Sequence, residues 1–588
     1  MRVTGNPDYR SAAAQPTNAS EIYISPDGDR ALAEVNNNVF VVDVPMIGGQ
    51  TPTVSVSNPA QAAVPVRRLT RIGGDFVGWH PDGNRVHFSI GRSYFTYDLA
   101  RADSLVRDST ARADSVRRTA AARQPGDSAQ AQPARTDTAR AARPAYEAAR
   151  LDVVITVPRD KPRGVAVLRN ARLITMKGTD VIERGDVLVR DNRIVAAGPA
   201  GSLQVPAGAR ELDMSGKTIL PGFVDTHAHM WPDWGIHRAQ PWIYTANLTY
   251  GVTTTRDPQT ATTDVLSYGD LVETGDIIGP RIFSTGPGVF WSDNITSLVD
   301  ARDVLRRYTD YNTNTIKQYM VGDRKVRQWV IMAARELRLT PTLEGGLDYK
   351  KNLTEAIDGY AGMEHSYPIA PIFKDNVRLI AESGITYTPT LLVLYGGPWA
   401  ENYWYQKYDI LRDEKLGRFT PRAELLQRGL RRSGWWHPSQ YAHPLIAAQA
   451  RKILEAGGRV GIGSHGQLQG LGYHWEMWTL ASGGTKPVDV LRAATILGAD
   501  AIGHGKDLGS IEGGKLADPA ILDANPLENI QNTNTVRYVM KNGRLYDGNT
   551  LAEVWPRQRD LGKPWWVAGD PARATPGSME REPRLPDK

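Results

Sequence analysis

The stretch TILPGFVDTHAHM, residues 218–230, decides how this chain of 588 residues is expected to fold. It runs apolar like a buried strand, passes a Pro-Gly pair and closes on two histidines one residue apart, His227 and His229. Alternate residues of a strand point to the same face, so both imidazoles are predicted to bind one metal ion if the strand continues through them. His-x-His alone is a weak motif, and its interpretation depends on the segments after it in the chain.

Further apolar stretches of strand length continue up to residue 506. With residues 218–227 they make eight candidate strands, the others being residues 251–257, 281–285, 315–320, 339–345, 362–366, 385–393 and 460–466. Segments with a helical period, such as RKVRQWVIMAAREL and NVRLIAESG, lie between some of them. Eight such units predict an α/β fold with a (β/α)₈ TIM barrel over residues 218–506.

The carboxyl ends of these strands carry side chains that can bind metal. Enzymes built on such barrels place their chemistry at that end of the strands. Besides the two histidines of the first strand, the set consists of Lys317, Glu344, His365 and His465. Core residues without a function would not be expected to gather at the same end each time. The chain has no cysteine, so a metal would be held by nitrogen and oxygen ligands.

Alternating apolar strands flank the predicted barrel on both sides. GVAVLRNARLITM and DVIERGDVLVRDNRIVAAG precede it, and GGKLADPAILD and VRYVMKNGRLYDG come after it. We expect residues 164–217 and 507–556 to form one small composite β-domain and residues 557–588 to be a C-terminal tail.

The first hundred residues contain an internal repeat. ISPDGDRALAEVNNNVFVVDV and WHPDGNRVHFSIGRSYFTYDL each pass a Pro-Asp-Gly turn into alternating strands. The repeat resembles blades of TolB-like β-propellers, although two blades are fewer than the roughly four to eight of a closed propeller. Residues 1–99 are predicted to be partial propeller-like repeats. Residues 100–150, rich in Ala, Arg, Asp, Ser and Thr, are predicted to be a disordered or loosely helical linker.

The motifs resemble those of the amidohydrolase superfamily. The resemblance is carried by TILPGFVDTHAH, TIKQY, GMEHS and GSIEGGKLADP and covers residues 164–556. Within the superfamily, the chain resembles a prolidase-like and imidazolonepropionase-like branch whose members carry N-terminal propeller repeats. It implies two divalent metal ions, expected to be zinc, bridged by Lys317 as a carboxylated lysine. It implies cleavage of a C–N bond in an amide, cyclic amide or acyl-amino acid by a metal-activated water. A lysine that reaches past its strand to solvent is the alternative for Lys317.

Two strand ends depart from the family pattern. The resemblance implies a histidine ligand on the fifth strand and an aspartate, both ligand and base, on the eighth, where this chain has Glu344 and His465. We interpret the pair as an exchange that keeps four histidines, one carboxylate and one carbamate around the metals. His465 is then the predicted general base, with Glu344 and Glu476 as alternatives.

Three more polar residues near the strand ends have candidate roles. Tyr319 is predicted to donate a hydrogen bond to a substrate carbonyl or carboxylate. Arg256 either pairs with a substrate carboxylate or, as we favour, is tied to Asp225 and Asp257. His474 is interpreted equally well as a partner of a metal ligand or as a rim histidine with a structural hydrogen bond.

Two other functions stay open: an esterase, lactonase or phosphotriesterase with the same metal site, and a non-catalytic barrel that binds or scaffolds. The expected partner is a small-molecule or peptide-like substrate, and a homo-oligomer is compatible with the sequence. The net charge of +6 is concentrated in residues 101–150, where a solvated flexible stretch is a better interpretation than a nucleic-acid interface.

The sequence says little about the compartment. No apolar run reaches the roughly 18 residues of a membrane span, so none is expected. The start MRVTGNPDYR lacks the apolar region of a signal peptide. The localisation therefore stays open, with export to the periplasm or beyond the cell expected if the true N-terminus is missing.

Overall fold

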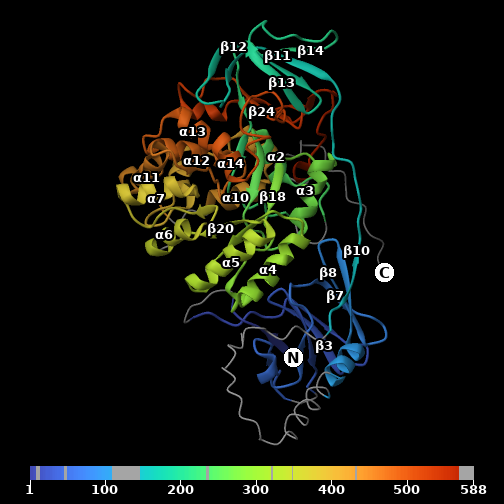
Figure 1. The fold of residues 1–588 in the computed structure, drawn as a ribbon. Helices are drawn as coiled ribbons and strands as arrows, with labels where there is room; N and C mark the ends of the chain where they lie inside the picture. Colours follow the sequence, from blue (N-terminus) through green and yellow to red (C-terminus); the bar gives the residue numbers. More distant parts are fainter. Residues whose placement is uncertain are drawn as a thin grey trace, which may run out of the picture. The chain divides into compact units, whose positions relative to one another are not determined.

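The computed structural model describes residues 1–7, 13–45, 49–108, 111, 146–232, 237–319, 322–346, 348–430 and 434–568. The chain divides into two compact units, each made of segments far apart in the sequence. Figure 1 labels helices and strands of both units. The first unit contains Met1–Thr156 and Gly288–Pro341, and the second contains Val157–Pro287 and Thr342–Lys588.

The second unit contains a nine-stranded mixed sheet built from both flanks of the predicted barrel. Its order is β13-β12-β11-β15-β24-β25-β26-β27, and β14 pairs with β11. The strands are β11 (Val165–Ile174), β12 (Val181–Arg190), β13 (Arg193–Pro199), β14 (Arg210–Asp213), β15 (Thr218–Pro221), β24 (Pro519–Leu522), β25 (Val536–Lys541), β26 (Arg544–Asp547) and β27 (Glu553–Trp555). Alternate residues such as Val187, Val189 and Ile521 share one buried cluster, so sequence segments more than 300 residues apart share one core.

Parallel strands carry the candidate site. In the second unit, β16 (Phe223–Asp225), β17 (Val252–Asp257) and β18 (Arg281–Ser284) pair in that order. A second parallel series is formed by β20 (Thr340–Glu344), β21 (Gly362–Glu364), β22 (Thr386–Thr388) and β23 (Arg459–Val460). With β19 (Thr315–Gln318), which belongs to the first unit, eight strands overlap the eight predicted stretches.

These strands confirm the α/β class, but the described pairings do not make the closed barrel that we predicted. Within the second unit the strands form separate parallel sheets, and they are short, from two residues in β23 to six in β17. Between the ends of the last and first strands, only single backbone hydrogen bonds occur in the described part, from Thr226 N to Ile462 O (2.9 Å) and from His465 N to His227 O (2.6 Å). Such short strands leave too few paired residues for a continuous ladder.

The stretch 218–227, predicted as one strand, is two strands in two sheets. β15 pairs with β24 of the mixed sheet, whereas β16 pairs with β17. Gly222 separates them at a point where chains approach closely, since a Cβ there would lie 2.3 Å from both Asp518 O and Thr253 Oγ1. The Pro-Gly pair is therefore the place where the chain passes from one sheet to the other, and only glycine fits it.

Helices connect the strands of the second unit. They are α2 (Trp242–Thr249), α3 (Asp264–Thr274), α6 (Tyr349–Asp358), α7 (Lys374–Ser383), α8 (Ala400–Lys407), α9 (Glu414–Phe419), α10 (Arg422–Leu430), α11 (His443–Glu455), α12 (Leu471–Ser482), α13 (Pro487–Ala493), α14 (Ile496–Ala501) and α15 (Trp565–Ala568), with a short 3-10 helix η3 (Leu391–Val393) after β22. Among the described residues, no helix combines the length and apolar character needed to cross a membrane.

The first unit contains the predicted repeat as two four-stranded antiparallel sheets. One has the order β2-β3-β4-β6 and the other β10-β9-β8-β7, while β1 and β5 pair in parallel. The strands are β1 (Arg2–Thr4), β2 (Glu21–Ile24), β3 (Arg30–Val35), β4 (Asn38–Asp43), β5 (Thr53–Ser55), β6 (Val66–Arg68), β7 (Asp75–Trp79), β8 (Arg85–Ile90), β9 (Ser93–Asp98) and β10 (Ala149–Asp152). Two sheets are a pair of blade-like elements, and the propeller itself stays a prediction.

The same unit contains a helix-strand-helix segment from the predicted barrel, with η2 (Trp291–Asp293), α4 (Leu298–Asp310), β19 and α5 (Arg324–Leu337). Ser297 caps α4 by accepting from the N–H of Asp300, and Asp323 caps α5 by accepting from the N–H of Val326. The second cap starts α5 at Arg324, where the sequence period predicts this helix.

The predicted linker, residues 100–150, is structured at both ends. The chain is helical over residues 99–108, and β10 begins at Ala149. The helix agrees with the loosely helical alternative of that prediction, whereas Ala149 and Arg150 are neither disordered nor helical, because β10 pairs with β9. The remainder of that prediction, residues 109–110 and 112–145, lies outside the described residues, as does the predicted tail beyond residue 568.

Candidate metal centre

The first two candidate ligands come after β16 instead of lying on it. The strand ends at Asp225 and the backbone bends at residues 226 and 227, so strand alternation is not what aims His227 and His229. Their rings nevertheless converge, with centroids 5.3 Å apart. Asp225 organises the bend, because its carboxylate accepts from the N–H of His227 (3.0 Å) and from the hydroxyl of Ser464 (2.5 Å).

Two further histidines complete a cluster of four. His465 lies after β23, and His365 lies directly after β21. The ring centroid of His465 lies 5.1 Å from that of His227 and 4.7 Å from that of His229. His365 lies 5.2 Å from His465 and 5.0 Å from His227. The ligand nitrogens of His227, His229 and His465 all lie within 4.8 Å of one another, so one ion can contact all three after small side-chain rotations.

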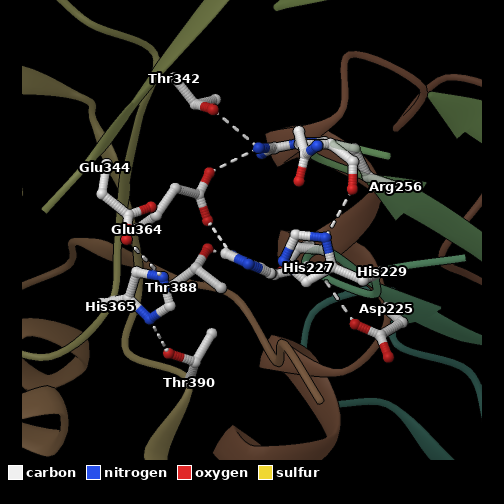
Figure 2. A network of polar contacts seen from close by, with 12 residues as sticks. Asp225, His227, His229, Arg256, Thr342, Glu344, Glu364, His365, Thr388 and Thr390 are labelled. Carbon is white, nitrogen blue, oxygen red and sulfur yellow. Dashed lines mark hydrogen bonds and ion pairs between the residues drawn. The ribbon is translucent and has the colours of Figure 1, made fainter. Parts of the chain in front are cut away.

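A buried carboxylate that the sequence analysis missed holds the first histidine. His227 Nδ1 donates to Oε2 of Glu364 (2.6 Å), and Arg256 donates from Nη2 to Oε1 of the same carboxylate (2.5 Å) and to Thr342 Oγ1 (2.7 Å), as Figure 2 shows. The side chains of His227 and Glu364 are fully buried, and that of Arg256 is 5% exposed. Glu364 immediately precedes His365 in GMEHS, and this position beside a predicted ligand is the sequence signal by which it could have been found.

The fourth histidine is held from both ring nitrogens. His365 Nε2 lies 3.1 Å from Glu344 Oε1, and His365 Nδ1 lies 2.7 Å from Thr390 Oγ1 (Figure 2). The structure thus brings the predicted Glu344 to the histidine cluster. Thr390 was not foreseen, because it lies after β22 at a positive φ of 44°, a conformation that β-branched residues rarely adopt. His365 and His465 also have positive φ, 70° and 60°, and such local strain is concentrated at functional sites.

Two aspartates beneath the cluster are buried and hydrogen-bonded. Burial raises the pKa of the Asp225 carboxyl to about 6 and that of Asp257 to about 7. Asp257 accepts from Ser284 Oγ (3.0 Å) and from the N–H of Gln259 (3.1 Å). The carbonyl oxygen of Gln259 in turn accepts from His229 Nδ1 (2.6 Å). The second histidine is therefore oriented through this loop.

Lys317 and Tyr319 belong to the first unit. Lys317 lies on β19 and is 1% exposed, so the alternative of a lysine that reaches solvent is wrong. Its Nζ lies 4.6 Å from the ring centroid of Tyr319.

Two polar residues from the sequence analysis, Arg256 and His474, have structural partners. Arg256 pairs with Glu364 of β21, not with Asp225 or Asp257 as predicted. These two aspartates accept instead from the hydroxyls of Ser464 and Ser284. His474, which lies in α12, donates from Nε2 to the carbonyl of Tyr250 (2.9 Å), and burial lowers the pKa of His474 to about 3. This favours the structural interpretation of His474.

The hydrogen bonds of Glu476 also do not suit the role of a general base. Its two oxygens accept from the N–H groups of Leu391 (2.6 Å) and Leu392 (2.9 Å), which start η3. Burial raises the pKa of Glu476 to about 8. Because η3 comes directly after Thr390, Glu476 holds the loop that places the Thr390 hydroxyl on His365.

The donor set fits a divalent ion such as zinc. A carboxylate and a backbone carbonyl can only accept, so His227 and His229 each carry their proton on Nδ1 and present Nε2 as the lone-pair nitrogen. Histidines that bind metal are held in this manner through the other ring nitrogen. Imidazoles together with the carboxylate of Glu344 are ligands that zinc accepts.

Curated relatives match a short part of the chain. A 5-methylthioadenosine/S-adenosylhomocysteine deaminase of Symbiobacterium thermophilum is 45% identical over 64 residues, 11% of this chain and 15% of that protein. An imidazolonepropionase of Mesorhizobium japonicum is 40% identical over 73 residues, 11% of this chain and 18% of that protein. The chain thus spans less than a fifth of the length of these relatives.

Solved structures and a family comparison extend further. A Xaa-Pro dipeptidase with bound methionine has a TM-score of 0.51 at 20% identity and covers 65% of this chain and 100% of its own. At this identity the likeness shows a shared fold alone. The sequence pattern of the Amidohydrolase family matches residues 218–546, more than half of the chain, from β15 into β26. The chain therefore belongs to the amidohydrolase family.

Proposed function

We propose that the chain is a metal-dependent hydrolase that cleaves a C–N bond in an amide, cyclic amide or acyl-amino acid. The observation that carries the proposal is the cluster of four histidines with Glu344, each member following the carboxyl end of a parallel strand. Membership of the amidohydrolase family supports it. So do the names of the relatives, a deaminase, an imidazolonepropionase and a Xaa-Pro dipeptidase.

His227, His229 and His465 would hold one ion, and His365 with Glu344 would supply a second. We propose zinc for both. When bound, such ions polarise a carbonyl and make a coordinated water more acidic. The exchange of ligand types between the fifth and eighth strands is consistent with this set, since Glu344 and His465 lie in the same cluster.

Lys317 is included in the proposal on the basis of the sequence resemblance. Its neutral Nζ would attack CO₂, forming an N–C bond and releasing one proton to solvent, which leaves an anionic carbamate. Tyr319, beside it, would donate a hydrogen bond to the substrate.

Glu344 is the better candidate for moving the proton. A histidine nitrogen bound to an ion has no lone pair left for a proton, and His465 is surrounded by three other imidazole rings. Glu344 is 17% exposed and already contacts His365. It would take the proton of the attacking water and hold it for the leaving amine.

Elemental analysis of the purified chain, beside a His227→Ala/His229→Ala variant, tests the metal site. About two equivalents that fall in the variant support the proposal, whereas no metal after reconstitution with zinc and bicarbonate favours a non-catalytic barrel. Glu344→Ala and His465→Ala should each lower the metal content, and full retention in both would refute the exchange. Matched amide and ester analogues then separate C–N hydrolysis from an esterase, lactonase or phosphotriesterase.

A further inference from the structure

The N-terminal repeat is joined to the segment of the first unit that carries Lys317. Arg71, just after β6, forms a bidentate ion pair with Asp303 of α4, with N–O distances of 2.7 and 3.0 Å. The hydroxyl of Tyr311 donates to Asp75 of β7 (3.2 Å). At Gly91 a Cβ would lie 2.3 Å from the carbonyl of Asp310, so the turn between β8 and β9 touches the end of α4. The repeat and this segment therefore make one unit.

A buried arginine forms the centre of that contact. Arg307 of α4 is 1% exposed; its Nε donates to the carbonyl of Ile72 (2.9 Å) and its Nη2 to Asp293 Oδ1 (2.8 Å). Asp293 Oδ2 also accepts from the N–H of Phe290 (2.9 Å). Gly73, at a φ of +108°, admits the arginine, because a Cβ there would lie 3.2 Å from Arg307 Nε.

The contact continues from Asp293 to Lys317. The ring of Phe290 stacks on Tyr319 at 4.5 Å and 12°. Val289 donates from its N–H to the carbonyl of Lys317 (2.9 Å) and accepts from the N–H of Tyr319 (2.9 Å). A continuous series of contacts thus runs from the repeat, through the Arg307–Asp293 pair, to the carbonyl of Lys317 and the N–H of Tyr319.

We propose that the N-terminal repeat positions Lys317 for carboxylation, with Arg307, Asp293 and Phe290 as positioning residues. The inference rests on the proposed function, in which Lys317 Nζ reacts with CO₂. The guanidinium is needed because only its fork contacts the Ile72 carbonyl and Asp293 together. Loss of either contact frees the turn at residues 289–293, and the Lys317 amine then samples orientations in which the carbamate is not held.

The experiment measures the carbamate itself. Full-length protein is incubated with zinc and ¹³C-bicarbonate, and the carbamate signal is monitored by ¹³C NMR, with Lys317→Ala to assign it. Arg307→Lys and Phe290→Leu should each raise, by about tenfold, the bicarbonate concentration at which half of Lys317 is carboxylated. Tenfold is the lower end of the effect usually seen when a residue that orients a metal ligand is replaced. Excess bicarbonate should restore occupancy. Phe290→Leu keeps the ion pair and serves if Arg307→Lys does not fold.

Arg71→Ala is the matched control. It removes an ion pair between the same two parts of the unit but lies off the series of contacts that ends at Lys317. It should lower thermal stability and leave the bicarbonate dependence unchanged. Unchanged dependence in both Arg307→Lys and Phe290→Leu would overturn the inference while the proposed function stands. Absence of a Lys317-dependent signal in the parent protein would overturn the inference together with the proposed role of Lys317.

Discussion

Replacing Glu364 by Gln gives the sharpest test of how this site is organised. The fully buried carboxylate accepts from two donors, Arg256 Nη2 at 2.5 Å and His227 Nδ1 at 2.6 Å. An amide of the same shape has only one oxygen, so in either orientation its NH₂ group faces one of these donors. If the NH₂ faces His227, the imidazole must move its proton to Nε2, the nitrogen that the ion needs.

The expected magnitudes differ for binding and folding. Loss of a residue that orients a metal ligand weakens metal binding by roughly 10–100-fold, which is about 1.4–2.7 kcal/mol. Removal of one partner of a buried ion pair costs about 3–5 kcal/mol of folding free energy, because the charge of Arg256 is left without compensation. Zinc affinity is measured by competition with a chromogenic chelator, and stability by unfolding of the metal-free protein.

A double variant separates this explanation from general damage. In Glu364→Gln/Arg256→Met the competing guanidinium is gone, so the amide oxygen of residue 364 can turn to His227, and most of the zinc affinity should return. Losses that simply add in the double variant would refute the reasoning. Glu382→Gln, in an exposed pair with Arg378, is the control and should leave both quantities unchanged.

Three further predictions concern the surroundings of the site. Thr390→Val, which removes the hydroxyl from His365, should weaken metal binding about tenfold, whereas Thr390→Ser should retain it; equal losses in both, measured by chelator competition, would show that the hydroxyl is not needed. Burial raises the pKa of Glu476 to about 8, so the folded protein keeps a proton there that the unfolded chain releases near the usual pKa of 4.5. Between these two pH values, the free energy of unfolding therefore falls as pH rises, by up to about 1.4 kcal/mol per pH unit. Urea unfolding at pH 5–8 should therefore show a shallower decline in Glu476→Gln than in the parent, and parallel curves would contradict the assignment. Proteolysis between residues 109 and 145 is expected from their composition. The two fragments should co-elute in size-exclusion chromatography, because the repeat and residues 288–341 form one unit. A separated N-terminal fragment would show that the contacts of Arg71 and Arg307 between these parts are too weak to hold them together.

Much of the site was readable from the sequence because its ligands sit at strand ends. The apolar period located stretches that overlap all eight strands, and five of these stretches carried a candidate metal-binding side chain at or near the carboxyl end. Four histidines and Glu344 then meet because the carboxyl ends of neighbouring parallel strands lie at one edge. Motif and period are local properties, so a single sequence suffices for them.

The supporting residues were not readable in the same way. Glu364 precedes a predicted ligand, but nothing local shows that it bonds His227, 137 residues earlier, or that Arg256 joins it instead of Asp257. Strand alternation also gave the wrong reason for the convergence of His227 and His229, since the chain leaves the strand at Asp225.

By itself, then, the sequence determined the α/β class, the candidate ligands at the strand ends and membership of the amidohydrolase family, because periodicity and motif spacing are written into consecutive residues. Only the tertiary structure decided which buried polar groups pair and that residues 288–341 pack with the N-terminal repeat. The physical reason is that a buried charge such as that of Arg307 or Arg256 must find a partner wherever the fold brings one near. That partner is selected by distance in space, which the order of residues does not record.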